Sequence, residues 1–516
     1  MNDMATNPYD AVAYPGHAFE QTHPARLATI AHFHGMQAAP SHAMRVLELG
    51  CGRGGNLIPM AALHRESRFV GIDLSGSAIA EAKRATAELG LENVVFHHRD
   101  ILAVGPELGS FDYILVHGVY SWVPDAVREA IMALIGGLLA PQGIAYVSYN
   151  ALPGCRLRDL ARDVMLYATR DITEPTERVR VARAALEAFA EASSGETFHG
   201  AALRQRLTQL ADTPDNVLYH DDLNPIARAF ALHEVLDAAQ RHGLQFLAEA
   251  SFPNMFAAAK GPAQAMLAAI PVEQGVLREQ TIDLLIGRAF RETLLCREGI
   301  PLQRAIGAGS LAPYHVAAHA RLVDEGEEAK PGIDRFEFEG GVRLSVDLHL
   351  CKAALRRLSQ AWPGSIAFDT LVSQAVADVG AALEPDLAGQ VARLEDALIA
   401  IFKAGLLDIK LEPPPLTTAV AERPRASMVA RWQAQTSREV ANLRHRTVGL
   451  DGIVGRKFVT LLDGSRTPEM LLADLNAFLD EIHAAGADVT DVPRRATAEQ
   501  VAMHLKDVAR LGLLHP

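Results

Sequence analysis

The glycine-rich stretch RVLELGCGRGGN, residues 45–56, holds the first residue types that could bind a ligand. Its glycines stand at positions 50, 52, 54 and 55. Glycines let the backbone turn sharply and approach a ligand with no Cβ atom in the way. The glycines follow an apolar run of the kind that forms a buried parallel strand. Residues 56–64 have a helical pattern, so a helix with unpaired N–H groups at its start would follow the loop. Strand, glycine loop and helix together predict a nucleotide-binding turn.

Two ligand patterns compete for this loop. Gly50, Gly52 and Gly55 fit the dinucleotide pattern G-x-G-x-x-G. Glu48 followed by Gly50, Gly52 and Gly54 fits the methyl-donor pattern E-x-G-x-G-x-G instead. Because a single glycine-rich match is weak evidence, the residues that follow the loop must decide between the two ligands.

Carboxylates follow the next two apolar runs. RFVGIDLS ends near Asp73, which is placed to accept hydrogen bonds from two ribose hydroxyls, a role that NAD would also require. NVVFHHRDIL ends near Asp100 and Ile101, a carboxylate and an apolar neighbour that suit the amino group and the ring of adenine. Capping of a following turn is the open alternative for Asp100. Both runs therefore point to an adenosine-containing ligand.

The fourth apolar run, FDYILVHGVYSWV, leads into polar and aromatic residues rather than into a nicotinamide half-domain. Glycine loop, ribose acid, adenine acid and polar fourth strand, in this order, resemble the class I S-adenosylmethionine-dependent methyltransferases. The resemblance implies S-adenosylmethionine as the cofactor, with the loop glycines at its amino-acid end. It also implies that Glu48 holds the loop or reaches the donor's ammonium group. A structural carboxylate bonded to loop amides stays open as the alternative.

The elements that must position these residues alternate regularly. Strands are predicted at 45–49, 68–73, 94–98, 111–117 and 143–149, and helices near 55–65, 77–90 and 125–139. This alternation predicts a parallel sheet with right-handed crossovers, whose ligands bind outside the C-terminal ends of the strands. The candidate residues at those ends are Gly50, Asp73, Asp100, His117 and Tyr149.

After Asn150 the predicted sheet is interrupted. Three helical patterns follow, and we interpret residues 151–228 as a helical insertion at the edge of the sheet. A delayed helix and the sixth strand are predicted within 233–252, and a seventh, antiparallel strand at 291–299. The predicted fold class is therefore α/β, a Rossmann-like class I methyltransferase domain with a seven-stranded sheet over residues 45–300.

Five side chains near the fourth and fifth strands are candidates for the acceptor side. His117 could bind the cofactor and act as a base, because imidazole titrates near pH ~6.5, although a satisfied hydrogen bonder is the alternative. Tyr149 is predicted to be catalytic. Tyr120, Trp122 and Tyr149 could wall an acceptor channel, since aromatic faces attract an ammonium group, and Asn150 is a further candidate channel residue. Packing on the following helix is the alternative for Trp122.

The first 44 residues precede the glycine loop and form a predicted N-terminal arm. They hold Tyr14, His23 and a short amphipathic helical pattern. We predict that the arm, with Tyr14 and His23, is a lid that folds over the donor and excludes water. The alternative is an arm that packs on the sheet, with His23 bonded near a helix N-cap.

A linker is predicted at 301–333, where the chain becomes acidic and contains Pro and Gly. Beyond it the chain repeats itself, since WPGSIAFDTLVSQA (362–375) matches LDGSRTPEMLLADL (462–475). Each repeat has a helix before this segment and closes on a helix followed by Gly-Leu-Leu. We therefore predict two α+β winged-helix-like modules, at 334–411 and, after a Pro-rich connector, within 412–516.

Composition restricts the partners of the chain. Its 516 residues, 49% hydrophobic and 22% charged, are typical of a globular protein with several domains. No apolar stretch reaches the roughly 20 residues of a membrane helix, and no secretion signal is found, so we expect a cytoplasmic protein without membrane insertion. The four cysteines lack a CxxC pattern, so neither a disulfide framework nor a metal site is predicted. A net charge of −13 argues against a large nucleic-acid surface.

Three more motifs make the resemblance specific: QTHPARLATIA (21–31), HGVYSWVP (117–124) and SYNALPG (148–154). With them the chain resembles bacterial methyltransferases that carry a methyltransferase regulatory domain, a family that includes lysine methyltransferases acting on surface proteins. Residues 219–252 resemble the start of the regulatory segment, and KAALRRLSQAWPGS resembles the C-terminal module. At position 155 this chain has a cysteine, where many members of the resembled family have an aromatic residue. The shape of the acceptor entrance depends on the residue at this position.

The resemblance implies a protein substrate, with a lysine amine as the leading acceptor. Two rival functions stay open. One is methylation of a small molecule, with the C-terminal half serving dimerisation, and the other is a DNA-binding protein that senses the donor. Winged helices often bind DNA and residues 423–457 are rich in Lys and Arg, but overall acidity favours docking of protein. The sequence leaves the oligomeric state open.

Overall fold

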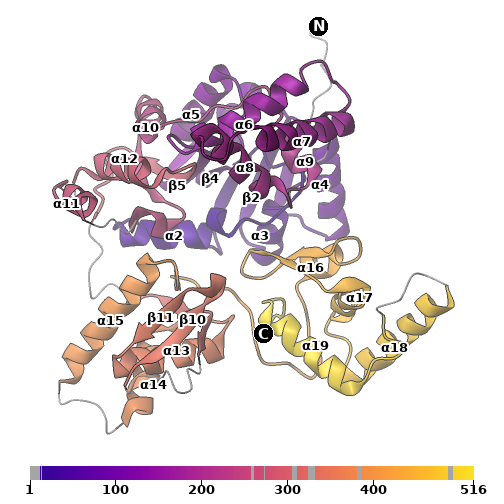
Figure 1. Cartoon of the computed structure of the whole chain (residues 1–516). Coiled ribbons are helices and arrows are strands. Elements are labelled where there is room, and N and C mark those ends of the chain that lie inside the picture. Colours follow the sequence, from indigo (N-terminus) through magenta and orange to yellow (C-terminus); the bar gives the residue numbers. More distant parts are fainter. Residues whose placement is uncertain are drawn as a thin grey trace. The chain divides into compact units, whose positions relative to one another are not determined.

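The computed structural model describes residues 12, 14–256, 261–271, 273–304, 311–323, 332–380, 386–485 and 492–516. The chain divides into two compact units (Figure 1). The first contains residues up to Gly16 and from Ile30 to position 305, and the second contains His17–Thr29 and everything from position 306 onward. Helix α2 (Pro24–Phe33), preceded by the 3-10 helix η1 (Glu20–Thr22), therefore belongs in part to each unit.

A seven-stranded sheet organises the first unit, in the order β3-β2-β1-β4-β5-β7-β6. Its strands are β1 (Arg45–Leu49), β2 (Arg68–Asp73), β3 (Val94–His98), β4 (Phe111–Val116), β5 (Leu139–Asn150), β6 (Leu244–Glu249) and β7 (Phe290–Arg297). The first five pair in parallel, and β7 runs antiparallel between β5 and β6. This sheet confirms the predicted fold class.

The crossovers of the parallel half are helical. They are α3 (Leu57–Leu63), α4 (Gly76–Glu88) and α5 (Asp125–Leu138). Strand order reverses between β1 and β4, which is the switch point where parallel sheets bind ligands. Leu47, Leu49 and Ile114 belong to the buried core of the sheet, which explains why these strands are continuous apolar runs.

Four helices follow β5: α6 (Cys155–Ala168), α7 (Pro175–Ala192), α8 (Phe198–Leu210) and α9 (Asp215–Asp221). They share a small core of their own that contains Leu186, Leu203 and Leu218. Helix α10 (Leu232–Gln240) then leads into β6, whereas η4 (Phe252–Phe256), α11 (Pro262–Ala268) and α12 (Gly275–Ile286) stand before β7. Throughout the described ranges, no helix is both long enough and apolar enough to cross a membrane.

The second unit begins with strands where the sequence predicted a linker. Its first part contains β8 (His315–Ala317), β9 (Ala320–Leu322), β10 (Asp334–Phe338), β11 (Arg343–Val346), α13 (His349–Ala361), β12 (Ile366–Ala367), α14 (Phe368–Val379), α15 (Leu387–Lys403) and β13 (Asp408–Lys410), with η6 (Glu339–Gly341) between β10 and β11. Strands β8 and β9 lie within 301–333, so that part of the linker prediction is wrong. Each strand is too short to show an alternating apolar pattern in the sequence. Both form because they pair with strands elsewhere in the second unit. Positions 324–331 lie outside the described residues.

The second part of this unit repeats the plan of the first. It contains α16 (Met428–Gln433), β14 (Glu439–Ala441), β15 (Thr447–Gly449), α17 (Gly452–Leu461), α18 (Pro468–Ala484) and α19 (Ala498–Arg510). In the first part β8 pairs with both β12 and β13. In the second, Arg425 and Ala426 bridge to Asp463 and Leu514 in the equivalent way. The two structures therefore reproduce the repeat found in the sequence.

Candidate functional site

The glycine loop follows β1 and has left-handed backbone angles, with φ of 80° at Gly50, 51° at Gly52 and 75° at Gly54. A Cβ atom on Gly50 would lie 2.3 Å from Cγ2 of Val119, and one on Gly54 would lie 2.6 Å from Cζ of Phe96. At Gly52, however, a Cβ atom would meet no atom within 4 Å. The loop is thus packed against the strands at two glycines and open at the third, which is where a ligand can approach its backbone.

Asp73 stands at the end of β2 and is bonded to the same loop. Its Oδ2 accepts the Gly52 N–H at 2.8 Å, and its Oδ1 accepts the Ser75 N–H at 2.8 Å. Ser75 in turn caps α4 by accepting the Ala78 N–H. Because each carboxylate oxygen has two lone pairs, this half-buried group can still accept hydroxyl protons from a ligand.

Glu48 is buried beneath the loop, 3% exposed. Its Oε1 accepts a hydrogen bond from Nδ2 of Asn56 at 2.9 Å, whereas its Oε2 has no hydrogen-bond partner among the described residues. Burial raises the pKa of Glu48 to about 7. A buried carboxylate oxygen without a donor is costly, so this atom is suited to a cationic group supplied by a ligand.

The adenine candidates lie at the end of β3. Asp100 is exposed, and its Oδ1 accepts the Leu102 N–H at 2.9 Å, so it caps the 3-10 helix η2 (Ile101–Ala103). Ile101 is partly buried and packs against the sheet core. Asp100 therefore has the capping role that the sequence left open as an alternative. Contact of Asp100 and Ile101 with adenine stays a prediction.

His117 follows β4 and is half-buried. Its Nδ1 lies 3.0 Å from the Tyr146 hydroxyl and 3.4 Å from the Ser148 hydroxyl. Burial lowers the pKa of His117 to about 4, so the imidazole is neutral at pH 7. A neutral ring with so low a pKa is a hydrogen-bond partner and a poor proton acceptor at that pH.

Tyr120 and Tyr149 belong to the sheet core. They are 3% and 1% exposed, and their rings pack against each other and against Phe230. The Tyr149 hydroxyl lies 2.9 Å from Oγ1 of Thr293, and burial raises the pKa of Tyr149 far above its usual range. Because fully buried rings cannot line an open channel or exchange protons with an acceptor, these two predicted roles are wrong.

The other two predicted channel residues differ in burial, since Asn150 is buried and Trp122 is not fully so. Trp122 is half-buried, with the Arg158 guanidinium 5.6 Å from its ring centroid, and so contacts the helical insertion. Asn150 ends β5, and its backbone N–H donates to Oγ of Ser121 at 2.8 Å. Cys155 is buried at the start of α6 and donates its thiol hydrogen to the Ala289 carbonyl at 3.0 Å. A channel role for Trp122 and Asn150 stays a prediction.

The two predicted lid residues lie in different units. In the first unit the arm passes close to the glycine loop, because a Cβ atom on Gly55 would lie 2.5 Å from the Gly16 carbonyl carbon. The Tyr14 ring lies edge-on to that of His220, 5.6 Å away. His23 belongs to the second unit, and its Nδ1 accepts the Ala25 N–H at 3.2 Å, the N-cap alternative. A lid role for Tyr14 and His23 stays a prediction.

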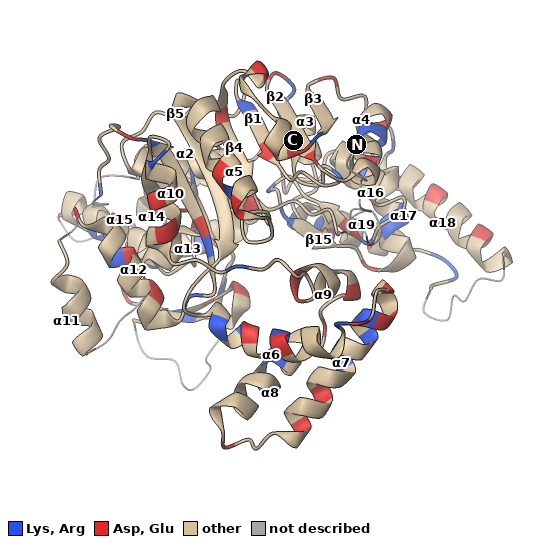
Figure 2. Ribbon diagram, turned by 90° about the horizontal axis from the view of Figure 1, so that it is seen from above, with Lys and Arg blue, Asp and Glu red and all other residues tan. Residues whose placement is uncertain are grey.

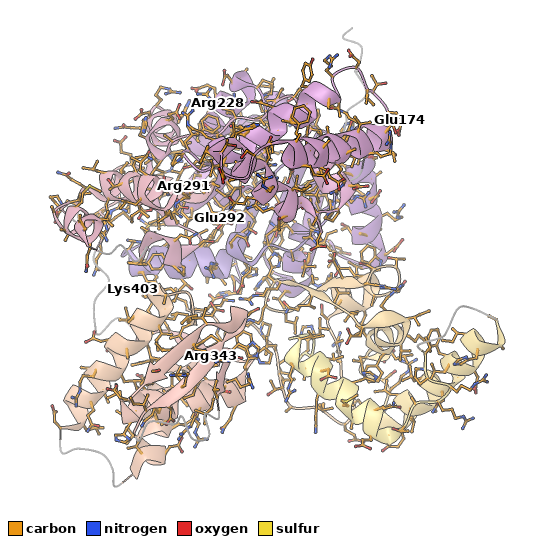
Figure 3. All side chains as sticks on the ribbon, in the orientation of Figure 1. Glu174, Arg228, Arg291, Glu292, Arg343 and Lys403 are labelled. Atoms are coloured by element: carbon orange, nitrogen blue, oxygen red, sulfur yellow. The ribbon has the colours of Figure 1, made fainter. Side chains whose placement is uncertain are left out.

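The sequence did not indicate the buried polar cluster on β7. Arg291 is fully buried and donates to carboxylates on β6 and α12, and its neighbour Glu292 accepts from Tyr146 on β5. Both side chains are buried, and Figure 3 labels them in the first unit. The available signal was RETLLCR, in which an Arg and a Glu interrupt a predicted strand.

The sheet order, with a glycine loop after β1 and a carboxylate after β2, is that of the class I S-adenosylmethionine-dependent methyltransferases. Three protein-family models match the chain. They describe a methyltransferase domain at 40–194, a predicted methyltransferase regulatory domain at 214–297, and a PKMT C-terminal winged helix domain at 422–513. The chain belongs to the PKMT family of S-adenosylmethionine-dependent methyltransferases, and S-adenosylmethionine is its cofactor.

Relatives resemble the chain over most of its length. The uncharacterised protein RP789 of Rickettsia prowazekii is 30% identical over 456 residues, which cover 86% of this chain and 81% of that protein. The structure of PKMT2 from Rickettsia typhi is 26% identical and has a TM-score of 0.86, with 97% of this chain and 99% of that chain covered. The same protein in complex with AdoHcy matches with 25% identity and a TM-score of 0.85 over the same shares.

If Glu48 binds the ammonium group of the donor, as the resemblance implies, donor affinity should depend on pH. Since the pKa of Glu48 is about 7 in the free protein and a ligand ammonium favours the ionised carboxylate, the affinity for S-adenosylhomocysteine should rise about tenfold between pH 6 and pH 8. Titration calorimetry across this range measures the slope. In the Glu48→Gln variant the slope should vanish, because the amide does not titrate. An equal slope in both proteins would assign the pH dependence to another group.

Proposed function

We propose that this methyltransferase modifies a protein side chain, with a lysine amine as the acceptor. The observation that carries the proposal is the match of the whole chain, C-terminal modules included, to a structure named PKMT2. A donor domain alone would suffice for a small acceptor, whereas here roughly two hundred residues of the second unit follow it. Such an extension is suited to holding a large substrate.

The chemistry required of the protein is mainly positioning. Bound S-adenosylmethionine supplies a methyl group on a sulfonium, and a neutral amine displaces the thioether in line with that bond. A lysine amine has an ordinary pKa of about 10.4, so it must lose a proton to solvent before it reacts. Correct alignment of donor and acceptor can supply on the order of 7–11 kcal/mol.

Five residues are proposed to hold the donor. The backbone of Gly52 would approach its amino-acid end, Oε2 of Glu48 would accept its ammonium, and Asp73 would accept its ribose hydroxyls. Asp100 and Ile101 would frame the adenine ring. The unpaired Oε2 of Glu48 and the open space at Gly52 support the first two assignments.

The two modules at 334–411 and 412–516 are proposed to dock protein rather than DNA. Helices α14 and α18, which follow the Gly-Ser turn shared by the two repeats, contain no Lys or Arg and carry Asp or Glu at several positions (Figure 2). DNA affinity depends on cationic side chains that neutralise phosphates. Acidic helices suit a substrate region rich in lysine. The cytoplasmic location expected from the sequence stays a prediction.

A labelling experiment tests the proposal. The purified chain is incubated with S-adenosylmethionine bearing a deuterated methyl group and with protein from a cell extract, and peptides are then sequenced by mass spectrometry. We expect the label on lysine side chains, and its absence with the Asp73→Ala variant. Label found only in small molecules would support the rival small-molecule methyltransferase. A DNA-binding sensor would leave the donor unconsumed, with no S-adenosylhomocysteine formed.

A further inference from the structure

Trp122 stands in a tight turn that lies against the glycine loop. Its backbone N–H donates to the Val119 carbonyl at 2.8 Å, and Cγ2 of Val119 is the atom that a Cβ on Gly50 would meet at 2.3 Å. In the same turn, Oγ of Ser121 accepts the Asn150 N–H from the end of β5 at 2.8 Å. The turn that carries Trp122 is therefore fixed at the C-terminal edge of the sheet, where parallel sheets bind ligands.

A cation from the helical insertion lies over the ring of this tryptophan. Arg158 on α6 places the carbon of its guanidinium 5.6 Å from the centroid of the Trp122 ring, within the range of a cation–π contact. An aromatic ring has two faces, and the arginine occupies one of them. Because Trp122 is only half-buried, part of this side chain stays accessible to a ligand. The insertion thus contacts the ligand edge of the sheet at a residue that can also contact an acceptor.

The C-terminal end of α9 holds Arg158 in this place. Nε of Arg158 donates to Oδ1 of Asp222 at 3.0 Å, and its Nη2 donates to the Asp221 carbonyl at 2.7 Å. Asp222 is buried, and its two oxygens also accept Nη2 of Arg206 at 2.8 and 2.9 Å. Burial disfavours the charge of Arg158, but Asp222 outweighs burial and raises the pKa of Arg158 above its usual range. The guanidinium over Trp122 is therefore both charged and fixed by its hydrogen bonds.

We propose that Arg158 is a positioning residue for methyl transfer, which together with Asp222 fixes the Trp122 ring so that its other face packs along the alkyl chain of an acceptor lysine. Lysine buries its alkyl chain along apolar surfaces while its amine stays at the end, where it can reach the donor methyl group. The acceptor part rests on the proposed lysine function, whereas the contact of Arg158 with Trp122 is a property of the protein alone. The helical insertion thereby takes part in aligning donor and acceptor.

Fluorine NMR of the full chain labelled with 5-fluorotryptophan tests the contact with Trp122. The chain has three tryptophans, and the Trp122 signal is the one that is lost in Trp122→Leu. Arg158→Met keeps a long side chain but removes the cation, so it should shift this signal. Arg158→Lys keeps a cation beside the ring and should shift it less. If the signal has the same position in the unmodified chain and in Arg158→Met, the proposal is overturned.

Arg183→Met is the matched control. Arg183 on α7 makes the same kinds of bond within the insertion, since it donates to Oδ1 of Asp215 at 3.0 Å and to the Leu210 carbonyl at 2.9 Å. Among the described residues, however, it has no cation–π contact. Its removal should leave the Trp122 signal where it is. An equal shift in Arg183→Met and Arg158→Met would mean that the signal reports only a general loosening of the insertion, and would contradict the proposal.

A double-mutant cycle tests whether Arg158 acts on transfer through Trp122. With poly-L-lysine as the probe acceptor, Arg158→Met and Trp122→Leu should each lower the kcat/KM for the acceptor about tenfold and leave the KM for S-adenosylmethionine unchanged. The double variant should also lose about tenfold rather than about a hundredfold, because the arginine has no ring left to position. Arg183→Met should keep its kcat/KM.

Two results of the cycle would overturn the positioning role of Arg158. One is a pair of losses that multiply in the double variant, and the other is an equal rise in the KM for S-adenosylmethionine. Either would assign Arg158 to the stability of the insertion or of the donor site. If poly-L-lysine is not methylated by the unmodified chain, the lysine assignment fails, and the fluorine signal still decides whether Arg158 holds Trp122.

Discussion

Replacement of Asp73 by Ala is expected to weaken the binding of S-adenosylhomocysteine by at least about 100-fold. Each hydrogen bond from a ribose hydroxyl to a charged acceptor contributes about 1.5–3 kcal/mol, and Asp73 can accept two. The same carboxylate accepts the N–H groups of Gly52 and Ser75, so its loss also frees the glycine loop. Titration calorimetry measures the dissociation constant.

Asp112→Ala is the control for this prediction. Asp112 stands near the start of β4, and its Oδ2 accepts the Arg45 N–H at 2.8 Å, so it makes the same kind of bond at the opposite edge of the sheet. Its loss should leave donor affinity within about twofold. If both variants bind equally well, the ribose does not lie on Asp73.

Replacement of Arg291 by Leu is expected to lower the free energy of unfolding of the first unit by about 3–5 kcal/mol. Arg291 is 0% exposed, donates to Asp283 at 2.8 Å and to Glu279 at 3.2 Å, and also donates to Glu249. Leucine would leave these carboxylates buried without their shared cation. Hydrogen exchange of first-unit amides in increasing urea measures the loss separately from the second unit.

Arg180→Ala provides the matched control. Arg180 pairs with Glu177 on the exposed face of α7, where solvent screens the attraction between the two charges. Its removal should leave first-unit exchange almost unchanged. Equal losses in the two variants would mean that the buried cluster on β7 does not stabilise the sheet, since a surface arginine would then matter as much.

The parallel half of the sheet could be predicted from the sequence because its strands are short apolar runs, and β1, β4 and most of β5 are buried on both faces. The first three strands have the predicted limits, and β4 ends at Val116, one residue earlier than expected. Strand β5 begins at Leu139 rather than at 143, because Leu139 already pairs with Phe111, although Pro141, Gln142 and Gly143 interrupt the apolar run and the register shifts there. Local pattern therefore suffices where burial is uniform.

The buried tyrosines show where local pattern fails. Tyr120 follows β4 and Tyr149 lies near the end of β5, at the sheet edge where parallel sheets bind ligands, so the sequence predicted a place beside the acceptor for both. Their burial depends on Phe230, which lies about eighty residues beyond Tyr149 in the chain and reaches β5 through a bridge to Ala151. No pattern within a single element contains that information.

The buried face of helix α12 cannot be predicted from an amphipathic pattern, which would place its leucines inside and its acidic residues outside. Its buried positions include Glu279 and Asp283, whereas Leu277 and Leu284 are exposed. The reason is Arg291 on β7, whose buried guanidinium requires carboxylates on the helix that covers it. Which face of α12 is buried therefore depends on ion pairs between α12 and β7, and the pattern within either element alone does not show them.

A crystal structure with S-adenosylhomocysteine bound would test the account most directly. We expect both ribose hydroxyls within about 3 Å of the Asp73 carboxylate and the ligand ammonium at a similar distance from Oε2 of Glu48. The backbone of Gly52 should contact the amino-acid end. A ribose that lies away from Asp73, with Oε2 of Glu48 still without a donor, would contradict the donor site described here.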